Sequence, residues 1–148
     1  MNRRTVVKAI AASGALIGLG AMMPRVAVAA WNKDAFNAKS QADALNALYG
    51  SAAEASADVM LKAPDIAENG AVVPVTVTHN MKADSVAIYA SANGTPLVAQ
   101  FMGPGAQTEV STRIKMGKTG DVIAVVKSGG KLHHAKKSVK VTIGGCGG

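Results

Sequence analysis

The 148-residue chain contains a single cysteine, Cys146, which stands between two pairs of glycines in the C-terminal sequence Gly-Gly-Cys-Gly-Gly, residues 144–148. One cysteine cannot form a disulfide within its own chain. It also excludes iron–sulfur clusters, c-type haem attachment and Cys-x-x-Cys redox chemistry within this chain. In an exported protein, an unpaired cysteine indicates an intermolecular disulfide or a reactive thiol. The candidate chemistry is therefore that of one terminal sulfur atom.

The residues beside the thiol restrict its use. They lack a Cβ and sample φ and ψ broadly, which predicts a thin, flexible swinging arm built from Gly144, Gly145, Gly147 and Gly148. At about 3.3–3.6 Å per residue, Cys146 would reach about 10 Å beyond Ile143 and could enter a narrow channel in another protein. A free thiol has a pKa of about 8.5, and the nearby C-terminal carboxylate opposes its ionisation. Such a thiol suits a covalent handle, on which a group is loaded, carried, altered and removed, better than a catalytic nucleophile.

Other uses of the side chains remain open. An exported β-sandwich module could use Cys146 for an intermolecular disulfide, giving a covalent dimer. A copper site could recruit soft or borderline ligands from His79, His133, His134, Met60, Met81, Met102 and Met116. Only glycines follow Cys146, unlike the Cys, His and Met cluster of a blue-copper loop, so structural or solvated roles are favoured and no metal or cofactor is predicted. Hydrolase motifs such as Gly-x-Ser-x-Gly and His-Glu-x-x-His do not occur.

The N-terminal residues 1–30 are typical of a cleaved export signal. A basic start with paired Arg3 and Arg4 precedes an uncharged apolar stretch over residues 9–23, and small residues follow around residues 27–30. The apolar stretch is shorter than the roughly 20 residues that span a membrane. The arginine pair favours the twin-arginine route. The sequence therefore predicts a periplasmic protein without a membrane span, whose mature chain begins near residue 31.

Charge is distributed unevenly over the predicted mature chain. Residues 31–109 hold 4 basic and 8 acidic side chains, whereas residues 110–148 hold 8 basic and 1 acidic. A basic C-terminal part could steer acidic proteins or small anions toward the protein, or could simply keep sheet edges soluble. Nucleic acid is not an expected partner, because the protein is predicted to be exported and has few aromatic side chains for stacking.

The elements that must position the arm follow from the periodicity. Ala38, Ala42, Leu45, Tyr49 and Ala52 recur at helical spacing, with Asp34 as a candidate N-cap and Gly50 as a stop, which predicts one or two short helices. After Ala57 the period changes to two. About seven short strands follow, separated by turn signals such as Asn69-Gly70, Asn93-Gly94 and Ser128-Gly129-Gly130.

Within these strands, Pro74 predicts a bulge or an edge position. The apolar run at residues 121–128 predicts a buried central strand. In the last strand, Val139, Val141 and Ile143 are predicted to face the core. The expected fold is mainly β: an immunoglobulin-like antiparallel β-sandwich of about seven strands, preceded by one or two short N-terminal helices. The expected organisation is a signal over residues 1–30, the helix and sandwich domain over residues 31–143, and the arm over residues 144–148.

With these features in place, the chain resembles the SoxY family of the bacterial Sox sulfur-oxidation system. The ending "VTIGGCGG" matches the carrier motif of that family, and "ADALNALYG", "APDIAENGAVVPVTV" and "STRIKM" are similar as well. The resemblance implies a covalent substrate carrier in the periplasm rather than an enzyme. It implies that Cys146 holds thiosulfate-derived sulfur as an S-thiosulfonate. It also implies a SoxZ-like β-sandwich subunit as partner, with transient docking to haem-containing, hydrolase and sulfane dehydrogenase enzymes.

Overall fold

The computed structural model describes residues 31–106 and 108–143, and within these ranges the side chains of residues 104–106 are left aside. The chain divides into two units, residues 1–31 and residues 32–148, and every element below belongs to the second unit. Over the described residues, no helix is both long and apolar enough to cross a membrane.

Two short helices open the described chain, α2 (Lys33–Asn37) and α3 (Gln41–Tyr49). The Asn32 side chain accepts a hydrogen bond from the Ala35 N–H, so Asn32, and not the predicted Asp34, is the N-cap of α2. Ser40 caps α3 in the same way through the Asp43 N–H. Gly50 ends α3 in the left-handed conformation with φ 68°, as predicted.

The predicted apolar face of the helical region was wrong in part. Ala42 is exposed, whereas Ala44 is fully buried and Leu45, Leu48 and Tyr49 pack around it. The helical phase restarts at Ser40, because the region forms two capped helices rather than one continuous helix. A spacing that runs from Ala38 into α3 therefore finds Leu45 and Tyr49 but misplaces Ala42.

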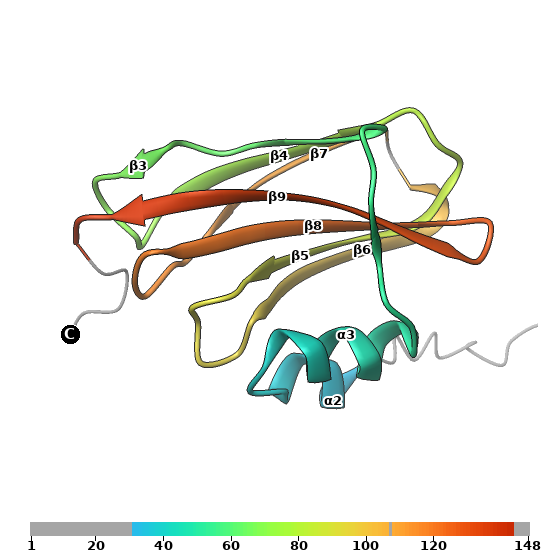
Figure 1. Cartoon of the computed structure of the whole chain (residues 1–148), viewed down its shortest axis with the longest axis horizontal. Helices are drawn as coiled ribbons and strands as arrows, with labels where there is room; N and C mark the ends of the chain where they lie inside the picture. Colours follow the sequence, from blue (N-terminus) through green and yellow to red (C-terminus); the bar gives the residue numbers. More distant parts are fainter. Residues whose placement is uncertain (1–30, 107, 144–148) are drawn as a thin grey trace, which may run out of the picture. The chain divides into compact units, whose positions relative to one another are not determined.

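The strands form two sheets (Figure 1). The larger sheet has the order β1-β9-β8-β5-β6, with β3 pairing to β9, and its strands are β1 (Glu54–Ala55), β9 (Lys131–Val141), β8 (Gly120–Ser128), β5 (Ala83–Ala90), β6 (Leu97–Ala106) and β3 (Ile66–Ala67). The smaller sheet has the order β2-β4-β7, with β2 (Val59–Lys62), β4 (Val73–His79) and β7 (Glu109–Ile114). The seven longer strands are antiparallel neighbours and match the seven predicted strands. The two-residue strands β1 and β3 pair in parallel with β9 and were not predicted.

The larger sheet is buried on both faces, which creates two apolar cores. One core fills the space between the sheets and includes Val75, Val86, Val126 and Val139. The other lies between this sheet and the helices, and includes Ala44, Tyr89, Ile123 and Val125. Residues 85–90 of β5 are consequently all buried, although alternation had predicted only Val86, Ile88 and Ala90 inside. The fold is thus the predicted β-sandwich with an added helical layer.

Two predictions about strand residues have different outcomes. Pro74 was predicted to mark a bulge or an edge position, and it lies in β4, the middle strand of its sheet. Because β2 pairs with β4 only from Thr76 onward, the proline stands beyond the end of β2, which is the local equivalent of an edge. Ile143 was predicted to face the core and instead has 68% of its side chain exposed. Strand β9 ends at Val141, and the alternation ends with it.

Candidate functional site

Cys146 and its flanking residues Gly144, Gly145, Gly147 and Gly148 lie outside the described residues. The structure does describe the place from which they continue, the chain end at residues 140–143. We call these four residues the arm root. The arm root contains the last two residues of β9, which pair with β3, while residues 131–139 of β9 pair with β8.

The arm root is held by a loop from the opposite half of the sequence. The N–H of Gly70 donates to the carbonyl oxygen of Ile143 at 2.8 Å, and the N–H of Thr142 donates to the carbonyl of Ala67 at 3.1 Å. The Thr142 hydroxyl donates to the carbonyl of Glu68 at 2.9 Å. Gly70 also accepts a bond from the Met116 N–H through its carbonyl oxygen. The last described residues are therefore fixed to the loop over residues 67–70, which itself is fixed to the end of β7.

A second contact holds the arm root from the other side. The N–H of Val141 donates to the Thr119 hydroxyl at 2.9 Å, and that hydroxyl lies 3.4 Å from the carbonyl oxygen of Val141. On the side of β3, the N–H of Lys140 also donates to the carbonyl of Asp65 at 2.9 Å. An exposed ion pair of 3.1 Å joins Asp65 to Lys137, and exposed pairs of this kind contribute little to stability. The hydrogen bonds rather than the charges fix the position of residue 143.

This geometry can present the C-terminal residues from a defined point. Glycines offer little resistance to rotation, whereas Thr142 and Ile143 are bonded in place. Cys146 is the third residue beyond Ile143, so it reaches only about 10 Å past the fixed root. Whatever acts on Cys146 must therefore approach the end of the sandwich that carries the arm root.

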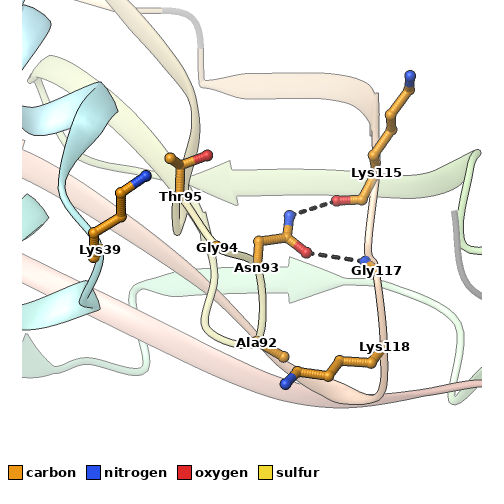
Figure 2. Close-up of a pocket in the computed structure, with 8 residues that line it drawn as sticks. All are labelled: Lys39, Ala92, Asn93, Gly94, Thr95, Lys115, Gly117 and Lys118. Carbon is orange, nitrogen blue, oxygen red and sulfur yellow. Dashed lines mark hydrogen bonds between the residues drawn. The ribbon is translucent and has the colours of Figure 1, made fainter. Parts of the chain in front are cut away.

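A lysine-lined pocket lies at this end of the sandwich (Figure 2). It is an open hollow of about 500 Å³ that is lined by Lys39, Ala92, Asn93, Gly94, Thr95, Lys115, Gly117 and Lys118. The pocket brings together the loop between the helices, the β5–β6 loop and the β7–β8 loop. The β7–β8 loop also carries Thr119, so pocket and arm root share one segment of chain. Sequence analysis missed this pocket, because its residues come from three distant parts of the chain.

The side chains considered as candidate copper ligands are spread over different elements. His79 ends β4 in the smaller sheet, and His133 and His134 lie on β9 in the larger sheet, where the latter two were expected. Nowhere in residues 31–106 and 108–143 do three or more His, Cys, Asp or Glu side chains gather in a way that could hold a metal ion. His134 Nδ1 lies 3.2 Å from the carbonyl oxygen of Ala53. His79 is buried, and neither of its ring nitrogens has a hydrogen-bond partner.

Two tyrosines with raised pKa values, Tyr49 on α3 and Tyr89 on β5, lie away from the arm root. Burial raises the pKa of Tyr49, and a 2.8 Å hydrogen bond to Ser85 partly offsets that rise. Burial raises the pKa of Tyr89 further, and the neighbouring Tyr49 adds to the effect. These phenols belong to the core between helices and sheet.

The comparisons with known proteins agree with this architecture. A family model described as the sulfur oxidation protein SoxY matches residues 45–146. The solved structure of the sulfur carrier protein SoxY from Chlorobium limicola f thiosulfatophilum is 45% identical, with a TM-score of 0.62, and the match covers 69% of this chain and 96% of that one. A superoxide reductase (neelaredoxin) from Ignicoccus hospitalis shares the fold alone, at 20% identity and a TM-score of 0.50 over 56% of this chain and 79% of that one. No curated protein sequence matches the chain at a significant level.

Proposed function

The chain belongs to the SoxY family of sulfur oxidation proteins, and from that premise we propose that it carries thiosulfate-derived sulfur covalently on Cys146. The observation that carries the proposal is the placement of the only thiol. The family match runs to Cys146 itself, three residues beyond a bonded arm root. The protein then acts as a carrier that presents substrate, and the bond-making and bond-breaking steps belong to partner enzymes.

The chemistry balances with one oxidation and one hydrolysis. The thiol and thiosulfate lose two electrons and one proton and form a sulfur–sulfur bond, which gives an S-thiosulfonate on Cys146. A haem-containing partner accepts the two electrons. Water then cleaves the terminal sulfonate as sulfate with release of a proton, which leaves a persulfide on the cysteine. A hydrolase performs the second step, and a sulfane dehydrogenase oxidises the remaining sulfur.

The four glycines serve this role by letting the thiol enter each enzyme while the sandwich stays outside. A SoxZ-like β-sandwich subunit is the expected stable partner. The signal-like residues 1–30 support export by the twin-arginine route to the periplasm, where the haem-containing enzymes of such a system work. The twin-arginine route carries folded cargo, which would allow a partner without its own signal to travel with the chain.

The experiment is intact mass measurement of the protein purified from thiosulfate-grown cells, before and after reductant. We expect reductant-reversible additions of roughly 32 mass units for one sulfur and roughly 112 for a thiosulfonate, both lost in Cys146→Ser. A protein that shows only its unmodified mass, or only a disulfide-linked dimer, would contradict sulfur carriage. The second result would favour the cross-linking alternative.

A further inference from the structure

The lining of the lysine-lined pocket is positively charged. Its three cationic side chains are Lys39, Lys115 and Lys118, and its lining contains no carboxylate. Across the described part of the chain, ion pairs join Lys136 to Asp121 and Lys137 to Asp65. None of the three pocket lysines therefore forms an ion pair with another described residue. In Figure 2, Lys39 lies on one side of the β5–β6 loop, and Lys115 and Lys118 lie on the other.

The pocket walls are fixed before any ligand arrives. The Asn93 side chain donates to the Lys115 carbonyl at 2.7 Å and accepts from the Gly117 N–H at 3.0 Å, which ties the β5–β6 loop to the β7–β8 loop. Ser91 and Asp121 exchange two further bonds of 2.9 Å, from the Ser91 N–H to the Asp121 carbonyl and from the Asp121 N–H to the Ser91 hydroxyl. A surface organised in advance loses less entropy when a partner binds.

The position of the pocket relates it to the arm root. Lys118 precedes Thr119, whose hydroxyl accepts the Val141 N–H two residues before the chain leaves the described region. Because Cys146 reaches only about 10 Å beyond Ile143, an enzyme that receives it must bring its surface close to this end of the sandwich. The lysines thus lie on a face that such an enzyme has to approach.

We propose that the lysine-lined pocket is a docking site for the acidic side chains of the enzyme surface that surrounds the entrance for the arm. The proposal rests on the carrier function of Cys146 and adds the partner chemistry that the carrier would recognise. A cavity of about 500 Å³ that is open to solvent exceeds what one sulfate or thiosulfate ion fills. Three lysines from two separate loops match a group of Asp and Glu side chains better than a single small oxyanion.

Charges on a pocket of this kind act mainly on the association rate, because complementary potentials raise the rate of encounter. Salt screens these potentials, so the effect should weaken as salt is added.

The chain offers a matched control for the test. Lys82 lies just before the start of β5 and Lys131 just after the end of β8, at the ends of these strands away from the pocket. There the Ser128 hydroxyl donates to the Lys82 carbonyl. Replacing either pair of lysines by glutamine changes the net charge by the same amount.

The test compares Lys115→Gln/Lys118→Gln with Lys82→Gln/Lys131→Gln in the full chain with its partner subunit. The periplasmic fraction of thiosulfate-grown cells supplies the enzymes, and the initial rate of adduct formation on Cys146 is followed by intact mass at rising carrier concentration. At 20 mM salt we expect kcat/KM of the pocket variant to fall by about three- to tenfold with kcat unchanged, and the difference to shrink below about twofold at 0.5 M salt. The control variant should stay within about twofold of the parent.

Equal loss in both variants would show a general charge effect and overturn the pocket proposal, as would an unaffected pocket variant. If titration with free thiosulfate shows binding that the pocket variant loses, while its loading kinetics match those of the parent, the pocket is a small-anion site and the docking proposal is wrong. Failure of the carrier function itself is distinguishable, because then the unsubstituted protein gains no adduct at all.

Discussion

Gly120 offers a sharp test of how tightly the two loops beside the arm root are packed. A Cβ added at this position would lie 2.5 Å from the Cβ of Ala92, and 3.2 Å and 3.3 Å from the Ala92 nitrogen and the Ser91 hydroxyl. The backbone at Gly120 is not in the left-handed region. If the space were open, Gly120→Ala would therefore stabilise the fold by about 0.4–1 kcal/mol, because alanine lowers the conformational entropy of the unfolded chain.

The clash outweighs that gain. The two Cβ atoms would have to separate by about 1 Å to reach ordinary contact, while hydrogen bonds between Ser91 and Asp121 hold the loops together. Overpacking of this kind typically costs about 1–3 kcal/mol. We expect Gly120→Ala to lower the free energy of unfolding by about 1–2 kcal/mol, measured by urea unfolding followed by circular dichroism.

A double-mutant cycle identifies the cause. In an Ala92→Gly background the nearest atom is gone, so adding Gly120→Ala should change stability by less than about 0.5 kcal/mol, giving a coupling of about 1–2 kcal/mol. Gly94→Ala is the matched control, because a Cβ at Gly94 meets nothing within 4 Å. Additive effects at the first pair, or a Gly120→Ala protein as stable as the parent, would refute the argument that these loops are packed against each other.

Three further outcomes are expected. The Tyr89 hydroxyl is buried without a partner, and burial raises its pKa above the unfolded value of about 10. The free energy of unfolding should therefore not depend on Tyr89 ionisation below pH 10 and should fall as the pH rises above 10. In urea titrations at pH 7 and 10.5, Tyr89→Phe should reduce this loss at pH 10.5 and leave the free energy of unfolding at pH 7 equal or higher. His79→Leu should raise the free energy of unfolding by about 1–3 kcal/mol, since both ring nitrogens are buried without partners; a loss of stability in the same titration would contradict this. Gly144→Val/Gly145→Val should leave unfolding unchanged but slow adduct formation on the carrier, and normal turnover would contradict the swinging-arm proposal.

The architecture was predictable where local pattern controls it. The seven longer strands follow from period-two alternation and turn residues, and β8 was recognised as central from its apolar run. Residues 85–90 of β5 are just as free of charge, so their burial on both faces had a signal in the sequence. That signal was overlooked, because alternation explained half of the run.

The contacts that fix the arm root could not be predicted from the sequence. The bond between Thr119 and Val141 spans 22 residues, and that between the Thr142 hydroxyl and Glu68 spans 74. No spacing rule relates such positions, because tertiary packing alone brings them together. The exposure of Ile143 has the same origin, since β9 has ended and the chain there pairs with Gly70 in a loop.

The pairing of β9 has a mechanical consequence. Under the proposed function, a pull on the C-terminal residues by a partner enzyme would place tension on the last strand. Strand β9 pairs with β8 on one side and with β1 and β3 on the other, and Figure 1 shows it between β8 and β3. A pull along the strand axis is therefore a shearing load. Shear stretches the whole ladder of hydrogen bonds at once, whereas peeling would break them one after another. Strand β9, which is hydrogen-bonded on both sides, would therefore transmit such a pull into the sheet without separating from its neighbours.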